Sequence, residues 1–198
     1  ALSAEAGLAS LDAASAFSAT AACFNLYNKT RAGDTSNQNV MLVPRLLRLT
    51  AKAVNTTASD MRLHVIIDDI DRYSSGGTAL TPVTTSHDEP TAFVDYVTKA
   101  TIYAGELTLA AASSAKVVGR ILMSSTILAI GDVLELWFGA PQPGSIDGTG
   151  LVTLCKTIAP VFLGRNQNMS IHEVGAAQAA DPKFQYEFWY EEHNHSKV

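Results

Sequence analysis

Aromatic and polar side chains alternate in the stretch Phe184-Gln185-Tyr186-Glu187-Phe188-Trp189-Tyr190-Glu191. Successive side chains of a β-strand point to opposite faces of a sheet, so this stretch predicts a strand with one buried aromatic face. Trp189 breaks the pattern because it shares the polar face with Glu187 and Glu191. We therefore predict that Trp189 anchors a contact with another molecule, with core packing as the alternative. For the second tryptophan, Trp137, we predict core packing.

Similar runs of alternating or β-branched residues recur upstream of this strand and predict eight to ten strands in total. They cover residues 24–27, 40–54, 61–67, 93–109, 116–130, 133–138, 151–163 and 168–174. Pro44 lacks a backbone donor, which predicts a bulge or an edge position at that point. Residues 68–78 and 139–150 are rich in glycine, proline and serine and are predicted to be long loops. Uneven loops between short strands favour an all-β fold, a jelly-roll-type antiparallel β-sandwich with Greek-key crossovers.

The chain has 198 residues, of which 47% are hydrophobic, and this favours one domain with a substantial core. We expect the sandwich to cover residues 23–192, followed by a polar tail over residues 193–198. Residues 1–22 contain ten alanines and two charged residues, so we expect an extended arm there that orders on a neighbouring subunit. Leu8, Leu11 and Phe17 are its candidate contact residues, and a frayed terminus is the alternative.

Charged residues make up 17% of the chain, and the net charge is −5. No basic run is present, which argues against nucleic acid binding, because that requires a cationic surface. No apolar stretch approaches the ~18 residues of a membrane span, so we expect no membrane partner. A surface with few charged side chains can be covered by another protein chain at a small desolvation cost. A large core would also explain the low proportion of charged residues.

No nucleophile elbow, phosphate loop, dinucleotide fingerprint or zinc-protease motif occurs, so we predict no catalytic and no cofactor-binding residues. Asp68, Asp69 and Asp71 cluster at the start of a predicted loop and raise the question of calcium. Tyr73 and Ser74 stand where the known calcium loop requires other residues. We therefore predict a turn in which the aspartates accept hydrogen bonds from backbone amides.

His172, His193 and His195 are possible zinc ligands, because a His-x-His pair suits transition metals. His193 and His195 fall in the expected tail, and we predict no metal site. Cys23 and Cys155 match no metal spacing, and their apolar or alternating contexts predict two buried thiols. A single disulfide between them stays open.

Three stretches resemble the jelly-roll head decoration, or cement, proteins of tailed bacteriophages. They are Val43-Pro44-Arg45-Leu46-Leu47-Arg48-Leu49-Thr50, Asp71-Arg72-Tyr73-Ser74-Ser75-Gly76-Gly77-Thr78 with Leu80-Thr81-Pro82-Val83, and Phe184-Gln185-Tyr186-Glu187-Phe188-Trp189-Tyr190-Glu191. The resemblance implies a non-enzymatic virion protein that forms homotrimers on the outer capsid surface and contacts the major capsid protein. It also implies assembly in the host cytoplasm.

Two alternative functions stay open at this point. A trimeric receptor-binding or adhesion head would carry its ligand site on the predicted loops 68–78 and 139–150. A cupin-like metalloenzyme would share the jelly-roll fold but would need a set of histidine and carboxylate ligands. The residues around His193 do not follow the cupin order.

Overall fold

The computed structural model describes residues 2–10, 17–30, 39–53, 61–82, 98–124, 128–139, 153–175 and 183–195, and these residues form strands and their connections. The strands are β1 (Leu2–Ser10), β2 (Ala21–Asn28), β3 (Asn39–Ala53), β4 (Met61–Asp68), β5 (Tyr73–Leu80), β6 (Ala100–Leu109), β7 (Lys116–Ser124), β8 (Val133–Phe138), β9 (Thr153–Ile158), β10 (Asn168–Val174) and β11 (Lys183–His195). In the described part of the chain, nothing forms a helix with the length and hydrophobicity of a membrane span.

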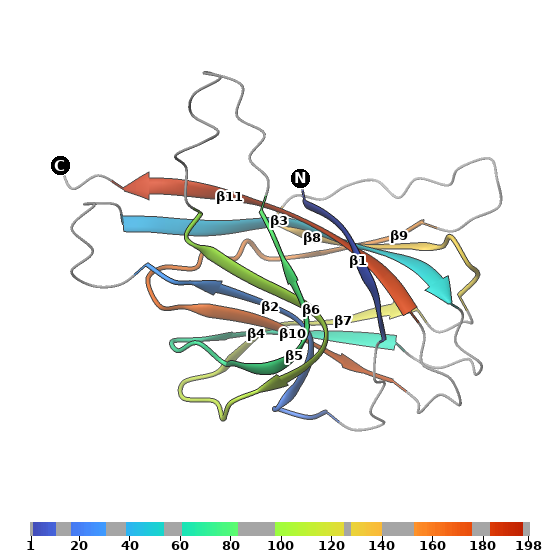
Figure 1. Cartoon of the computed structure of the whole chain (residues 1–198), viewed down its shortest axis with the longest axis horizontal. Helices are drawn as coiled ribbons and strands as arrows, with labels where there is room; N and C mark the ends of the chain where they lie inside the picture. The colour runs from blue at the N-terminus through green and yellow to red at the C-terminus, as the bar shows by residue number, and fades with distance from the viewer. Residues whose placement is uncertain are drawn as a thin grey trace, which may run out of the picture.

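The strands form two sheets that lie face to face (Figure 1). One sheet has the order β1-β11-β3-β8-β9, and the other has the order β5-β6-β2-β10-β4-β7. Apart from β5, β6 and β9, the strands pair from the two ends of the chain inward. β1 pairs with β11, β2 with β10, β3 with β8 and β4 with β7. A long hairpin rolled up in this way is the jelly-roll connectivity. The predicted all-β, jelly-roll-type sandwich is therefore confirmed.

The core lies between the two sheets and consists of hydrocarbon and aromatic side chains. Phe24 of β2 and Phe188 of β11 are both fully buried, and their ring centroids lie 4.7 Å apart across the interface between the sheets. As the alternating sequence of β11 predicts, Phe184, Tyr186 and Phe188 point into the core and are buried. Burial of each large apolar side chain stabilises the fold by roughly 1.5–3 kcal/mol.

The predicted bulge near Pro44 is also confirmed. The ladder between β11 and β3 is regular from the pair Phe184 and Ala51 to the pair Trp189 and Leu46, and then shifts so that Tyr190 faces Pro44. Arg45 is the extra residue on β3, and its side chain is exposed. An additional residue in one strand of a pair bends that strand, so β3 bends at this bulge.

The predicted loop over residues 68–78 is wrong for most of its length, because β5 begins at Tyr73 and pairs with β6. Gly76 and Gly77 have φ angles of 85° and 63°, and the register shifts between Gly76 and Thr78. A Cβ on Gly77 would lie 2.6 Å from the backbone carbonyl oxygen of Ala104, so close packing and the positive φ angle both favour glycine there. The Ser-Ser-Gly-Gly sequence is thus a bulge within a strand rather than a loop tip.

Both ends of the described chain belong to sheet structure. β1 pairs with β11 of its own chain, so Leu2–Ser10 form an edge strand of the five-stranded sheet, whereas an arm is expected over residues 1–22. At the other end, β11 continues to His195, which pairs with Asn39. The expected boundaries at residues 23 and 192 therefore do not coincide with the ends of the sheets.

Candidate functional site

Two tryptophans lie in one row on the outer face of the five-stranded sheet. Trp189 of β11 faces Leu46 of β3, and Leu46 faces Trp137 of β8. Directly opposed residues of neighbouring strands share a face, so all three side chains point away from the core. Trp189 is 40% exposed, as its position beside Glu187 predicts, whereas Leu46 between the two tryptophans is fully buried. The prediction of core packing for Trp137 is wrong, because its neighbours Leu136 and Phe138 fill the core instead.

A row of charged side chains runs beside the tryptophans, with Arg48 of β3 between two glutamates. Its Nε donates a hydrogen bond to Glu135 Oε1 at 2.9 Å, and its Nη1 donates to Glu187 Oε2 at 3.0 Å. Partial burial alone would raise the pKa of Glu135. Hydrogen bonds from Trp137, Arg48 and Cys155 outweigh that effect and lower this pKa below its usual value.

Each indole is fixed by the glutamate two residues before it. Trp189 Nε1 donates to Glu187 Oε1 at 2.8 Å, and Trp137 Nε1 donates to Glu135 Oε2 at 3.0 Å. The same Glu-x-Trp arrangement therefore occurs on both sides of β3. We name this group the tryptophan–glutamate cluster, and it consists of Leu46, Arg48, Glu135, Trp137, Glu187 and Trp189.

Sequence reasoning found only part of this cluster. The sequence predicts Trp189 as a contact residue and places Glu187 on the polar face of the same strand, whereas it does not single out Arg48 or Glu135. The repeated tripeptides Glu135-Leu136-Trp137 and Glu187-Phe188-Trp189 are the signal that was available. Their pairing across β3 depends on a register that a single sequence does not reveal.

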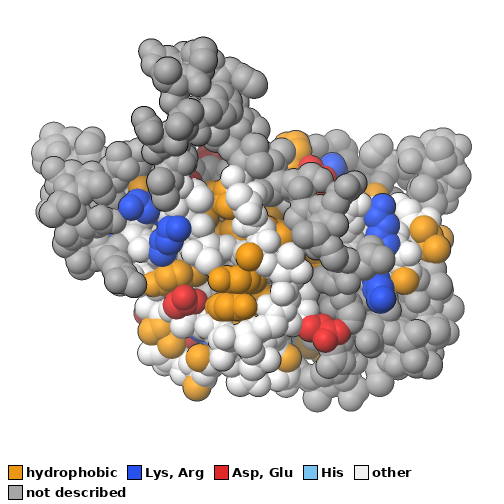
Figure 2. All heavy atoms as spheres, in the orientation of Figure 1, with side chains coloured by type: hydrophobic (Ala, Val, Ile, Leu, Met, Phe, Trp, Pro, Cys, Tyr) orange, Lys and Arg blue, Asp and Glu red, His pale blue; other side chains and the backbone are white. Residues whose placement is uncertain are grey.

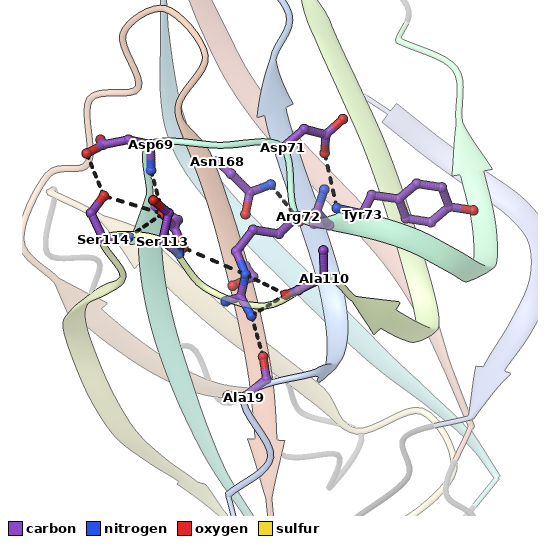
Figure 3. A network of polar contacts seen from close by, with 12 residues as sticks. Ala19, Asp69, Asp71, Arg72, Tyr73, Ala110, Ser113, Ser114 and Asn168 are labelled. Carbon is purple, nitrogen blue, oxygen red and sulfur yellow. Dashed lines mark hydrogen bonds and ion pairs between the residues drawn. The ribbon is translucent and has the colours of Figure 1, made fainter.

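The acidic residues considered for calcium form a turn, as predicted (Figure 3). Asp68 Oδ2 accepts a hydrogen bond from the Ser113 amide at 3.0 Å, and Asp68 Oδ1 accepts one from the Ser114 amide at 2.9 Å. Asp71 Oδ1 accepts one from the Tyr73 amide. Burial alone would raise the pKa of Asp68, but these amides and the charge of Arg72 hold it below its usual value.

Arg72 is fully buried and connects three parts of the chain on the outer face of the six-stranded sheet (Figure 3). Its Nη2 donates to the Ala19 carbonyl at 2.5 Å and to the Ala110 carbonyl at 2.9 Å, while its Nε lies 3.8 Å from Asp68 Oδ2. A buried cation needs such partners, because desolvation penalises an unpaired charge. The network therefore holds the connections before β2 and after β6 onto the sheet.

His172 belongs to the same outer face and is fully buried. Its Nδ1 donates to the carbonyls of Ala21 at 2.6 Å and Ser18 at 3.0 Å, and its Nε2 accepts from Ser170 Oγ at 2.9 Å. Carbonyl oxygens only accept, so the proton of the neutral ring resides on Nδ1. Burial lowers the pKa of His172 to about 4, and the charge of Arg72 adds to this shift.

Phe17, Leu8 and Leu11 of the N-terminal segment are also predicted to contact a neighbouring subunit. Phe17 is 44% exposed, and its ring packs 5.5 Å from that of His64 and 5.3 Å from that of His172. Leu8 lies in β1, of which the structure describes the backbone, and Leu11 lies outside the described residues. The roles of these residues and of Trp189 in an interface stay predictions.

The remaining candidate ligands have local partners. His193 lies within β11 rather than after the last strand, and its Nε2 contacts Glu191 Oε2 at 2.9 Å. Among the described residues, no group of three or more histidine, cysteine or acidic side chains is arranged to hold a metal ion. No disulfide joins Cys23 and Cys155, and Cys155, whose Sγ donates to Glu135 Oε2 at 3.3 Å, is only half-buried.

Exposed apolar side chains gather on β7. Val117, Val118 and Leu122 are 47%, 37% and 45% exposed, and β7 is the last strand of its sheet. The strand also carries the exposed charged residues Lys116 and Arg120, and it lies against β9 of the other sheet. Charges on an edge strand reduce pairing with another chain, so the exposed apolar side chains of β7 rather than its backbone are the candidate contact. On the face drawn in Figure 2, charged side chains are sparse and lie scattered among uncharged ones.

Comparisons of this chain with protein-family models, with curated proteins and with solved structures found no match.

Proposed function

We propose that this chain is a non-enzymatic virion structural protein, a capsid decoration or cement protein that binds the outer capsid surface and stabilises the shell. It forms a homotrimer, contacts the major capsid protein and reaches the virion after assembly in the host cytoplasm. The observation that carries the proposal is the apolar edge strand β7, which exposes Val117, Val118 and Leu122. Such a surface on a folded domain is typical of a contact with another protein.

The fold supports this proposal. A protein that bridges shell subunits must transmit force without deforming, and two sheets closed around a hydrocarbon core are rigid. β1 lies against β5 and β6 on one side of the sandwich, and β7 lies against β9 on the other. The sparse charge of the chain keeps the desolvation cost of coverage small.

The two alternative functions lose support from particular residues. In a cupin-like enzyme the histidines would point into the interior, whereas His172 points to the outer face and bonds to Ser170 and two carbonyls. For a receptor-binding head, the first of the two predicted ligand loops is largely strand β5. The second, residues 139–150, lies outside the described residues except for Gly139 and does not bear on the choice.

Co-sedimentation of the purified protein with undecorated capsid shells tests the proposal. We expect saturable binding that raises the temperature at which the shells open. The double substitution V117K/L122K places two charges on β7 and is expected to abolish trimer formation or shell binding. The matched control is Ile70→Lys, which changes a 36% exposed apolar residue outside β7 and is expected to leave both unchanged.

Two outcomes contradict the proposal. One is a chain that does not sediment with shells at any concentration tested. The other is a β7 double variant that folds, as shown by an unchanged circular dichroism spectrum, and still binds shells and forms the oligomer like the unmodified protein.

A further inference from the structure

We propose that the tryptophan–glutamate cluster on the outer face of the five-stranded sheet binds a neutral oligosaccharide. The inference is independent of the proposed function, because it concerns a different face of the molecule from β7. Two indoles supply apolar platforms, and in the row beside them a central guanidinium with two carboxylates supplies hydrogen-bonding groups.

The spacing of the platforms suits a chain of sugar rings. Trp189 and Trp137 lie in one row with β3 between their strands, so their backbones are two strand spacings, about 10 Å, apart. Two pyranose rings in an extended oligosaccharide cover a similar length. A ring can therefore stack on each indole while hydroxyl groups along one edge of the oligosaccharide meet Arg48 and Glu187 in the neighbouring row.

The indoles are held in place before any ligand arrives. Each N–H group is already bonded to a glutamate, at 2.8 Å for Trp189 and 3.0 Å for Trp137, and both glutamates are bonded to Arg48. The polar edge of each indole is thus satisfied, and the apolar surface is what remains for a ligand. Because these side chains are ordered in advance, little conformational entropy is lost on binding.

The charges of the cluster favour a neutral ligand. Arg48 carries one positive charge and faces two glutamates, which leaves the cluster with a net negative charge at neutral pH. Glu191 neutralises the neighbouring Arg45 at a distance of 2.6 Å. Phosphate-bearing and sulfated ligands are therefore disfavoured, since they need an excess of cationic groups.

The apolar area of this face is too small for a stable contact with a folded protein. Among the described residues of this face, two large hydrophobic side chains are more than a third exposed: Phe162, which precedes the bridge between Leu163 and Leu42 of β3, and Trp189. Glutamates and arginines surround it, whereas the core of a protein interface is depleted of charge and buries over ~1,000 Å² in total. A pyranose ring has one apolar face and a rim of hydroxyl groups, which matches an indole platform beside polar side chains.

Intrinsic fluorescence tests the inference directly, because the chain contains two tryptophans and both belong to the cluster. The probes are maltohexaose, cellohexaose and chitohexaose, with a sulfated hexasaccharide as the anionic comparison. We expect a saturable change in emission with at least one neutral hexasaccharide, and a dissociation constant that isothermal titration calorimetry reproduces.

Variants separate stacking from structural effects. Trp189→Ala is expected to weaken binding about tenfold or more, whereas Trp189→Phe retains an aromatic platform and recovers part of the affinity. The matched control is Phe162→Ala, which removes a 55% exposed aromatic ring outside the cluster and is expected to bind like the unmodified protein. Thermal unfolding of each variant shows that the fold is retained.

Three outcomes overturn the inference. The first is that no neutral hexasaccharide gives a saturable change at millimolar concentration. The second is that only the sulfated sugar binds. The third is that Trp189→Ala and Phe162→Ala bind equally well. Loss of shell binding in Trp189→Ala without any sugar binding would assign this face to a protein partner and would also overturn the inference.

Discussion

Acidification to pH 5 should destabilise the protein through His172 in particular. The ring is neutral in the folded state because its pKa falls to about 4, whereas in the unfolded chain the pKa is 6.5. Between these two values the unfolded chain binds a proton that the folded protein does not, so stability decreases as pH falls. Linkage gives a loss of about 2 kcal/mol at pH 5 and about 3 kcal/mol at pH 4, relative to pH 7.5.

The assay is urea unfolding at pH 7.5 and pH 5.0, for the unmodified protein and for His172→Asn. The asparagine amide can donate to the Ala21 carbonyl but does not titrate. The variant should be less stable at pH 7.5, yet should lose about 2 kcal/mol less on acidification than the unmodified protein. Carboxylates titrate in both proteins, so their contributions to the loss of stability cancel when the two losses are compared. Equal losses in the two proteins would refute the assignment of a buried neutral imidazole.

Three further predictions concern other contacts. Asp68→Ala removes the amide hydrogen bonds of a buried carboxylate and leaves a buried guanidinium without its counterion, so urea unfolding should show a loss of about 3–5 kcal/mol. Gly77→Ala should lose about 3 kcal/mol because of its positive φ and a 2.6 Å contact with a backbone carbonyl, whereas Gly164→Ala should lose less than about 1 kcal/mol; equal losses would contradict this account. In the native protein a thiol reagent should label Cys155 and not Cys23, because burial raises the pKa of the Cys23 thiol. Labelling of Cys23 in the native protein would contradict its burial.

Strands with a clear alternating pattern could be predicted from the sequence. The ranges 133–138 and 168–174 agree with β8 and β10, because each strand has its apolar residues at the spacing of a pleated sheet. The bulge at Pro44 was also predictable, since proline lacks the donor that a regular ladder requires. These features depend on local chemistry, which a single sequence contains.

Other elements depend on partners that lie far away in the chain. β1 is built mainly of alanine and serine, so the alternation of its apolar residues with Ser3, Glu5 and Gly7 is weak, and its position follows from backbone pairing with β11. β5 was taken as a loop because Gly76 and Gly77 resemble a turn, whereas they permit close approach to β6. Local patterns do not reveal such long-range contacts.

In the candidate site, too, local features could be predicted from the sequence and long-range contacts could not. The outward direction of Trp189 followed from its place between Phe188 and Tyr190. The hydrogen bonds of Arg48 to glutamates on two other strands required the register of the sheet. Arg72, which binds carbonyls both before β2 and after β6, likewise gave no signal in the sequence.

The mass of the protein in solution is the most direct test of the claim that this sandwich functions by packing against other chains. One chain has a mass of 21.0 kDa, so sedimentation equilibrium at micromolar concentration should give about 63 kDa, the mass of three chains. The charged β7 variant should shift this mass towards that of one chain. A mass of one chain for the unmodified protein at every concentration, both alone and with shells present, would contradict the account.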